Sequence, residues 1–208
     1  MLSTIRENIR LIRNTIQTLS ESIQIQYTVR LVAVSKTKPV TDLFEAYNEG
    51  QRHFGENYVD ELLGKVKQMP DDVMWHFIGH LQSNKAKLLA AIPNLYCVET
   101  IDSQKLAEKL NNSRQTTRLP PLKVFVQVNT SSEGTKSGVE PESCISLARF
   151  IIERCPSLAF SGLMTIGMPG ETNDFRILSS LRDSLCAELC LDKSAVELSM
   201  GIDRKSVV

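Results

Sequence analysis

Apolar residues recur every three or four positions through the first part of the chain. The series consists of Leu2, Ile5, Ile9, Ile12, Ile16, Leu19 and Ile23. This spacing puts the side chains on one face of a helix of about six turns. Because the pattern ends after three heptads, it predicts a single helix over residues 2–23 that docks on a larger body, not a coiled coil.

After this helix, short apolar runs alternate with helix-like segments. The runs predict strands at Arg30–Val34, His53–Gly55, Trp75–Ile78, Leu95–Val98, Val124–Val128, Ala159–Met164 and Ala195–Ser199. Helices are predicted over Val40–Gly50, Asn57–Met69, Lys85–Ala91, Ser103–Asn111, Pro141–Arg154 and Phe175–Cys190. This alternation indicates parallel strands joined by helical crossovers. Runs as apolar as LVAV and VFVQV are typical of a sheet that is covered on both faces.

Seven such units predict an α/β fold, either a (β/α) barrel or a doubly wound open sheet, and the spacing does not separate the two. A barrel needs eight strands, but only nine residues follow Ser199, too few for another helix and strand. The chain has 208 residues and no low-complexity linker, so we expect a single domain over residues 1–208.

The charged and sulfur-containing residues limit the kinds of partner and compartment. The 24 basic and 24 acidic residues balance, so no net field attracts nucleic acid or an anionic membrane. No apolar run approaches the roughly 18 residues of a membrane span. Five cysteines without a CxxC pair indicate free thiols in a reducing compartment, and we expect a cytoplasmic protein. Arg6, Arg10 and Arg13 leave a mitochondrial presequence as the alternative.

Two pairs of residues have spacings that resemble metal sites. Cys186 and Cys190 lie one helical turn apart, and His76 and His80 lie four residues apart. Neither pair has further ligands at the required spacing, and the second falls on a strand and the loop after it. The sequence therefore predicts no metal site.

Lys36 ends the most apolar of the predicted strands, in LVAVSKTKP. The carboxyl ends of parallel strands are where barrels and open α/β sheets bind their ligands. Apolar neighbours disfavour the charged form of a lysine and so provide a neutral amine that attacks an aldehyde. An ordinary strand-end lysine with its ammonium in water is the alternative. Lys38 is a weaker candidate, because Pro39 follows it where the chain leaves the strand.

Polar residues at the ends of three other strands favour a ligand site. HFGENY provides Asn57 after the second strand, and WHFIGHLQSNK places several polar groups after the third. LSMG near the end of the seventh strand offers the Ser199 hydroxyl and the backbone N–H groups beside Gly201, which suit a phosphate. The segment Asn129–Val139 is either a lid over this rim or a solvated loop.

Six segments resemble, in order, motifs of the pyridoxal phosphate homeostasis proteins, also called the proline synthase co-transcribed homologues. The segments are AVSKTKP, FGENYVDEL, WHFIGHLQSNK, VQVNTSSEGTKSGV, GLMTIG and ELSMG. The resemblance covers Val29 to Gly201, and six motifs in one order argue against chance. It implies a TIM-type (β/α) barrel related to the N-terminal domain of alanine racemase. It also implies a protein of vitamin B6 homeostasis that binds pyridoxal 5′-phosphate without established catalytic turnover.

The resemblance assigns roles to residues that match the motifs. Lys36 corresponds to the lysine that holds pyridoxal 5′-phosphate as a Schiff base. Asn57 corresponds to a residue near the cofactor ring. Ser199, Met200 and Gly201 correspond to part of the phosphate cradle. No catalytic residue is implied.

The chain departs from the family pattern after Gly201. Family members continue through a helix into a last strand that resembles VRIG(S/T)xIFG and supplies an arginine near the ring. Here residues 202–208 read IDRKSVV. We therefore expect the eighth strand to be absent from this chain, as in a truncated form, with two unpaired sheet edges. Such a chain is expected to bind the cofactor weakly, and a fragment that does not bind it is an alternative.

An enzyme is the strongest competing function, because a barrel with a Schiff-base lysine also suits an amino-acid racemase or an aldolase. The second acid/base of a racemase comes from another domain in the alanine racemase family, and the chain has no room for one. An aldolase needs an acid or base near Lys36, and Glu56 is the best spare carboxylate, although it could equally cap the following helix. We expect a monomeric carrier with pyridoxal-phosphate-dependent apoenzymes as partners, and neither nucleic acid nor membrane.

Overall fold

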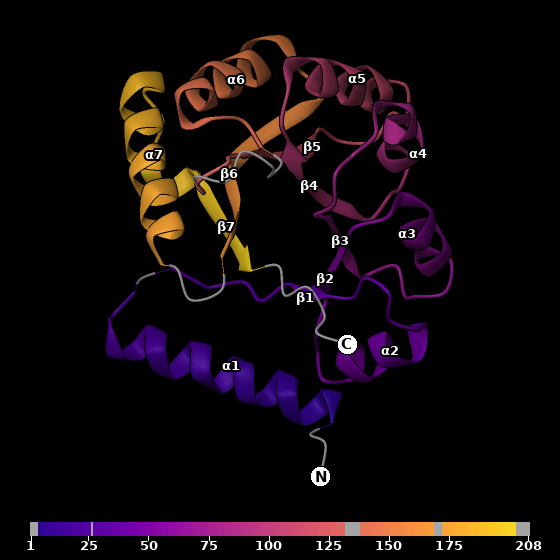
Figure 1. Cartoon of the computed structure of the whole chain (residues 1–208). Helices are drawn as coiled ribbons and strands as arrows, with labels where there is room; N and C mark the ends of the chain where they lie inside the picture. Colours follow the sequence, from indigo (N-terminus) through magenta and orange to yellow (C-terminus); the bar gives the residue numbers. More distant parts are fainter. Residues whose placement is uncertain (1–3, 26, 132–137, 169–171, 203–208) are drawn as a thin grey trace.

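Seven parallel strands form one curved sheet in the computed structural model, which describes residues 4–25, 27–131, 138–168 and 172–202 (Figure 1). The strands are β1 Ala33–Val34, β2 His53–Glu56, β3 Met74–Phe77, β4 Leu95–Ile101, β5 Leu122–Gln127, β6 Leu158–Gly167 and β7 Glu197–Ile202. They follow one another in chain order, as barrel strands do, whereas the order of a doubly wound sheet reverses. The open half-barrel confirms the predicted α/β fold of the TIM type.

Helices surround the outside of the sheet. They are α1 Ile5–Ser22, α2 Val40–Asn48, α3 Val59–Val66, α4 Ala86–Ala90, α5 Gln104–Gln115, α6 Pro141–Arg154 and α7 Asn173–Leu189, with short 3₁₀ turns at η1 Ser83–Lys85 and η2 Lys193–Ala195. Figure 1 shows α2 to α7 in order around the strands, with α1 lying across one end. Proline at the first position of α6 explains why its predicted bounds are correct, because the fixed φ of proline suits a helix start.

β1 is shorter than predicted, because hydrogen bonds from the Gln51 side chain take the place of backbone pairing at its start. The Gln51 amide donates to the carbonyl oxygens of Leu31 and His53, at 2.8 and 2.6 Å. These bonds hold the segment before β1 against the start of β2 without strand pairing.

β4 is longer than predicted because two polar residues lie inside the strand. Glu99 and Thr100 are 3% and 2% exposed, and β4 continues through them to Ile101. The apolar run alone predicts an end at Val98. A barrel interior with polar groups explains the error, since an inward-facing strand position need not be apolar.

The core has two parts of unequal size. The large part lies between the sheet and its helices and includes the fully buried side chains of Phe54, Trp75, Leu62 and Leu89. The small part consists of Cys97, Phe125 and Met164, packed with Tyr96 and Ile166. Because most apolar burial is on the helix side, the other face of the sheet is left for polar groups.

α1 docks through its first half only. Thr4 and Glu7 form a capping box at its start, and Ile9 is its one buried residue. Arg10 binds the Glu49 carboxylate, which fixes this half against the end of α2. Leu19 and Ile23 are 58% and 68% exposed, so the predicted helix docks on the body of the protein, but the second half of its apolar stripe does not.

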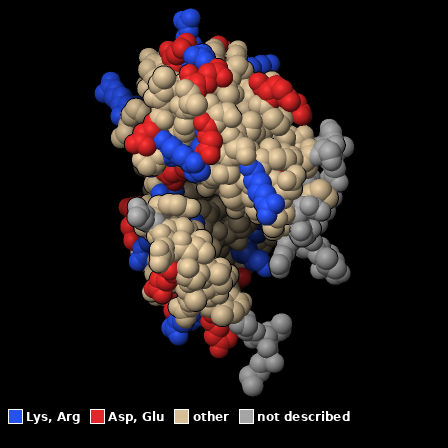
Figure 2. All heavy atoms as spheres, turned by 90° about the vertical axis from the view of Figure 1, so that its left-hand side faces the viewer, with Lys and Arg blue, Asp and Glu red and all other residues tan. Residues whose placement is uncertain are grey.

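β1 and β7 are the two edges of the sheet, and no described residue forms an eighth strand between them. Arg30 Nη1 lies 2.6 Å from Glu197 Oε2 and links the start of the first strand to the last across this gap. Figure 2 shows the molecule hollowed on the open side, between α7 and α1. Among the described helices, none is both long and apolar enough to cross a membrane.

Candidate functional site

Lys36 follows β1 at the rim formed by the carboxyl ends of the strands, and its side chain is half-buried. The preceding Ser35 is buried and donates to Glu56 Oε1, on the side of the sheet that carries α3. Lys36 stands in the turn that follows, and if the alternation of β1 continues to it we expect its side chain on the opposite side, that of the barrel interior. Lys38 is exposed beyond the turn, so burial favours Lys36 over Lys38.

Asn57 lies directly after β2, at the same rim, in close backbone contact with Gly79 after β3. A Cβ at Gly79 would stand 2.1 Å from the Asn57 carbonyl oxygen, so only glycine allows this approach. The Thr100 hydroxyl donates to Gly79 O at 2.6 Å and holds the loop from the other side. The buried side-chain oxygen Asn57 Oδ1 has no hydrogen-bond donor among the described residues.

Ser199, Met200 and Gly201 all lie inside β7, which continues past its predicted end at Ser199 to Ile202. They pair with Met164, Thr165 and Ile166 of β6. Met200 and Gly201 are exposed near the end of this edge strand. Ser199 Oγ donates to Glu99 Oε2 at 2.5 Å, so its hydroxyl hydrogen is already engaged.

A chain of hydrogen bonds crosses the barrel interior from Ser199 to β2. Glu99 Oε1 lies 2.5 Å from His76 Nδ1, and His76 Nε2 lies 2.8 Å from His53 Nδ1. Burial alone would raise the pKa of Glu99, but the hydrogen bonds from His76 and Ser199 hold it below its usual value. The sequence prediction missed this chain because its members come from four strands, although period-two alternation was a usable signal.

Cys97 completes a group that has the ligand types of a metal site. Its Sγ lies 3.1 Å from His76 Nδ1 and 3.4 Å from Glu99 Oε1. Donors on a tetrahedral zinc stand about 3.3 Å apart, whereas His76 Nδ1 and Glu99 Oε1 are hydrogen-bonded at 2.5 Å. Burial and the nearby Glu99 raise the pKa of the Cys97 thiol well above its usual value, which disfavours the thiolate a metal needs.

Charged and aromatic groups form the floor of the interior, at the amino ends of the strands. Lys123 Nζ donates to Tyr96 Oη at 3.0 Å, and Arg30 lies 5.0 Å from the Tyr96 ring centre. Beside this floor, a cleft of about 660 Å³ separates α1 from the strands, lined in part by Arg13, Tyr27 and His53. The cleft lies at the opposite end of the strands from Lys36.

Acid is expected to destabilise the protein through His53. Burial, with His76 nearby, lowers the pKa of His53 to about 4, while unfolding returns it to about 6.5. Between these values the unfolded state binds more protons, so the free energy of unfolding should fall as pH drops from about 6.5 to about 4. The ring is partly solvated, so we expect a loss of about 1–2 kcal/mol.

Urea unfolding at several pH values measures this effect. Replacing His53 with glutamine should flatten the slope between about pH 6.5 and 5.5, where even an unfolded glutamate stays almost fully ionised. An equal slope in both proteins would show that another group is responsible.

Known proteins resemble this chain in sequence and in fold. Residues 1–182 match the alanine racemase N-terminal domain family. The pyridoxal phosphate homeostasis protein of Schizosaccharomyces pombe is 47% identical over 207 residues, which cover 97% of this chain and 84% of that protein. The chain belongs to the pyridoxal phosphate homeostasis protein family. The human homeostasis protein is 49% identical over 185 residues, which cover 83% of this chain and 67% of the human protein.

Solved structures include a member of the homeostasis protein family with cofactor. PipY of Synechococcus elongatus with pyridoxal phosphate bound has a TM-score of 0.65 and 26% identity, over 89% of this chain and 96% of PipY. The structure of PipY without the cofactor has a TM-score of 0.71 and 27% identity, over 90% of this chain and 97% of PipY. Alanine racemase of Clostridium difficile has a TM-score of 0.67 at 14% identity, which shows a shared fold only.

Of two further predictions for the rim, the structure decides the one on Glu56 and does not describe enough of the segment Asn129–Val139 to decide the other. Glu56 does not cap α3, because Tyr58 is the N-cap and Glu56 is buried against Ser35 and Lys65. The segment Asn129–Val139 lies largely outside the described residues, as do residues 203–208 of the tail.

Proposed function

We propose that this chain binds pyridoxal 5′-phosphate through Lys36 and serves in its homeostasis as a carrier. The observation that carries the proposal is the position of Lys36, half-buried in the turn directly after β1, at the carboxyl ends of the strands of a racemase-type barrel. The names of its relatives and the cofactor bound to PipY support the same ligand.

The residues of the rim fit parts of this cofactor unequally. Asn57 Oδ1 is a buried acceptor without a donor among the described residues, so a donor group of the cofactor would satisfy it. Ser199 fits the phosphate less well, because its hydroxyl donates to the Glu99 carboxylate. We therefore assign phosphate binding to the exposed backbone of Met200 and Gly201.

The covalent link needs only the cofactor aldehyde and the lysine. The neutral Lys36 amine adds to the aldehyde carbon, a carbon–nitrogen double bond replaces the carbon–oxygen bond, and one water leaves. No electron donor or acceptor is required.

Replacing Lys36 with arginine is expected to abolish this link while keeping the positive charge. Purified protein is mixed with pyridoxal 5′-phosphate, the absorbance is recorded, and the product is reduced with borohydride and mapped by peptide mass spectrometry. The reduced adduct should lie on Lys36 in the native protein and be lost in K36R. The matched control K38R should label normally, because Lys38 is exposed beyond the turn. Labelling spread evenly over surface lysines would contradict the proposal.

A carrier role is favoured over an enzyme by the surroundings of Glu56. This carboxylate is the best sequence candidate for an acid or base near Lys36, but it is 0% exposed and bonded to Ser35 and Lys65. A panel of amino acids added to cofactor-loaded protein should therefore give neither racemisation nor transamination. Sustained turnover of any of them would favour the enzyme alternative.

Delivery to other proteins is the second part of the proposal. We infer that pyridoxal-phosphate-dependent apoenzymes receive the cofactor and that the carrier acts as a monomer in the cytoplasm. Mixing loaded protein with such an apoenzyme should restore its activity faster than the same concentration of cofactor released into buffer. Sedimentation of the purified chain measures its oligomeric state.

A further inference from the structure

Lys65 is a buried lysine that makes three short hydrogen bonds beside Lys36. It lies on α3 with its side chain 6% exposed. Its Nζ donates to Ser35 O, Glu56 Oε1 and Glu61 Oε1, each at 2.6 Å. An ammonium has three N–H donors, so all three are used. We call Lys65, Glu56 and Glu61 the Lys65 cluster.

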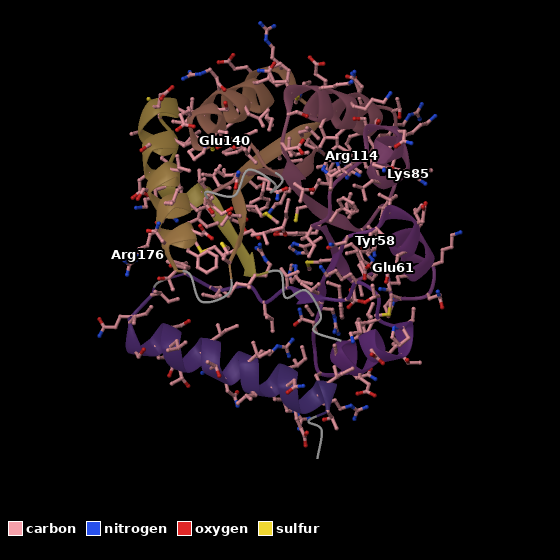
Figure 3. All side chains as sticks on the ribbon, in the orientation of Figure 1. Tyr58, Glu61, Lys85, Arg114, Glu140 and Arg176 are labelled. Atoms are coloured by element: carbon pink, nitrogen blue, oxygen red, sulfur yellow. The ribbon has the colours of Figure 1, made fainter. Side chains whose placement is uncertain are left out.

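The Lys65 cluster holds the backbone on both sides of Lys36. On one side, Ser35 O accepts from Lys65, and Ser35 Oγ donates to Glu56 Oε1 at 2.6 Å. On the other side, the backbone N–H of Thr37 donates to Glu61 Oε1 at 2.7 Å. Glu61 Oε1 therefore accepts from both Lys65 and Thr37. Figure 3 labels Glu61 near the start of α3.

The turn that the Lys65 cluster holds has an uncommon backbone conformation. Thr37 has φ of +61°, in the left-handed region that β-branched residues rarely adopt. Such a conformation persists only where surrounding contacts fix it, and it is concentrated at functional sites. Two bonds hold it here: Thr37 N–H donates to Glu61 Oε1, and Lys38 N–H donates to Ser35 O at 3.1 Å across the turn. The first of them comes from a side chain outside the turn.

Stability alone does not explain buried charges at this position. A protein in which apolar side chains of similar volume replace a buried ion pair is often at least as stable. Burial raises the pKa of Glu56 despite the bonds from Lys65 and Ser35, so this environment is unfavourable for its charge. What the Lys65 cluster provides instead is a fixed direction for the residue between Ser35 and Thr37.

We propose that the Lys65 cluster, through Glu61 above all, is the positioning device that aims the Lys36 side chain into the barrel. This inference rests on the proposed role of Lys36 and adds residues that do not touch the cofactor. Glu61 is the residue to change, because its side chain is 24% exposed and its loss leaves Lys65 bonded to Glu56 and Ser35.

Alanine at Glu61 removes both hydrogen bonds of this side chain, whereas glutamine keeps an oxygen acceptor at the same place. E61A is expected to weaken cofactor binding about tenfold, with borohydride-trapped label moving from Lys36 to Lys38 and other lysines. E61Q should stay within about threefold of the native protein. E61D, whose carboxylate is one methylene shorter, should fall between them. Thermal unfolding monitors whether each variant is folded, and E61D replaces E61A if the latter does not fold.

A second measurement leaves the cofactor out. Limiting acetic anhydride is applied across a range of pH, and acetylation of Lys36 and Lys38 is compared by peptide mass spectrometry. The pH profile of Lys36 acetylation should change in E61A and not in E61Q, while that of Lys38 stays the same in both. A general loss of structure in E61A would change the pH profiles of acetylation of both lysines.

The two measurements separate the inference from the proposed function. If folded E61A keeps the native affinity, label distribution and acetylation profile, the positioning role is wrong, and Lys36 is still the cofactor lysine. If the native protein shows no label on Lys36 but E61A changes its acetylation profile, the proposed function is wrong, and the positioning role stands.

Discussion

Replacing Gly79 with alanine is expected to lower the free energy of unfolding by about 2–4 kcal/mol and to weaken cofactor binding. The added Cβ would stand 2.1 Å from Asn57 O and 2.6 Å from Asn57 C and Cα. All three are backbone atoms, so no side-chain rotation relieves the overlap. The rim segment that carries Asn57 must move away from the end of β3.

Gly64 provides the matched control for this substitution. It lies on α3, it is exposed, and nothing among the described residues comes within 4 Å of the place a Cβ would take. Alanine there should stabilise the helix by about 0.5–1 kcal/mol. Urea unfolding of G79A and G64A should therefore shift in opposite directions, and cofactor titration should change in G79A alone. A stable G79A with native affinity would show that the loop after β3 adapts without cost.

Much of the fold follows from patterns within single segments. Apolar runs and their spacing predict the seven strands, because each strand contributes apolar side chains to the core between the sheet and its helices. The start of α6 is predicted by Pro141 alone, which acts locally. The place of Lys36 just after the first strand is likewise predicted from one segment, whereas its role stays a prediction.

What the sequence does not predict depends on contacts between segments. Lys65 bonds Glu61 at helical spacing, but its bond to Ser35 crosses 30 residues. Glu99 is polar and so indicates the end of a strand, although it belongs to the interior hydrogen-bond chain. The extension of β7 beyond Ser199 to Ile202 depends on its pairing with Thr165 to Gly167 of β6. Such contacts are set by tertiary packing, which single-segment patterns do not contain.

Alanine at Gly162 is expected to have the largest effect on stability, a loss of more than about 3 kcal/mol. Gly162 lies in β6 opposite Glu197, the first residue of β7. A Cβ there would stand 1.9 Å from Glu197 O and 2.7 Å from Glu197 C, well inside van der Waals contact. The start of β7 must then separate from β6, and Glu197 moves away from Arg30, which links the two sheet edges.

Stability and site geometry should change together in this variant, because β7 also carries Ser199, Met200 and Gly201. Urea unfolding measures the first, and cofactor titration at low denaturant measures the second. G201A is the control for stability, since nothing among the described residues lies within 4 Å of its added Cβ. Its free energy of unfolding should stay within about 0.5 kcal/mol of the native value. A G162A protein as stable as G201A would mean that β7 pairs with β6 in a different register, and the assignment of Met200 and Gly201 to the phosphate would then be wrong.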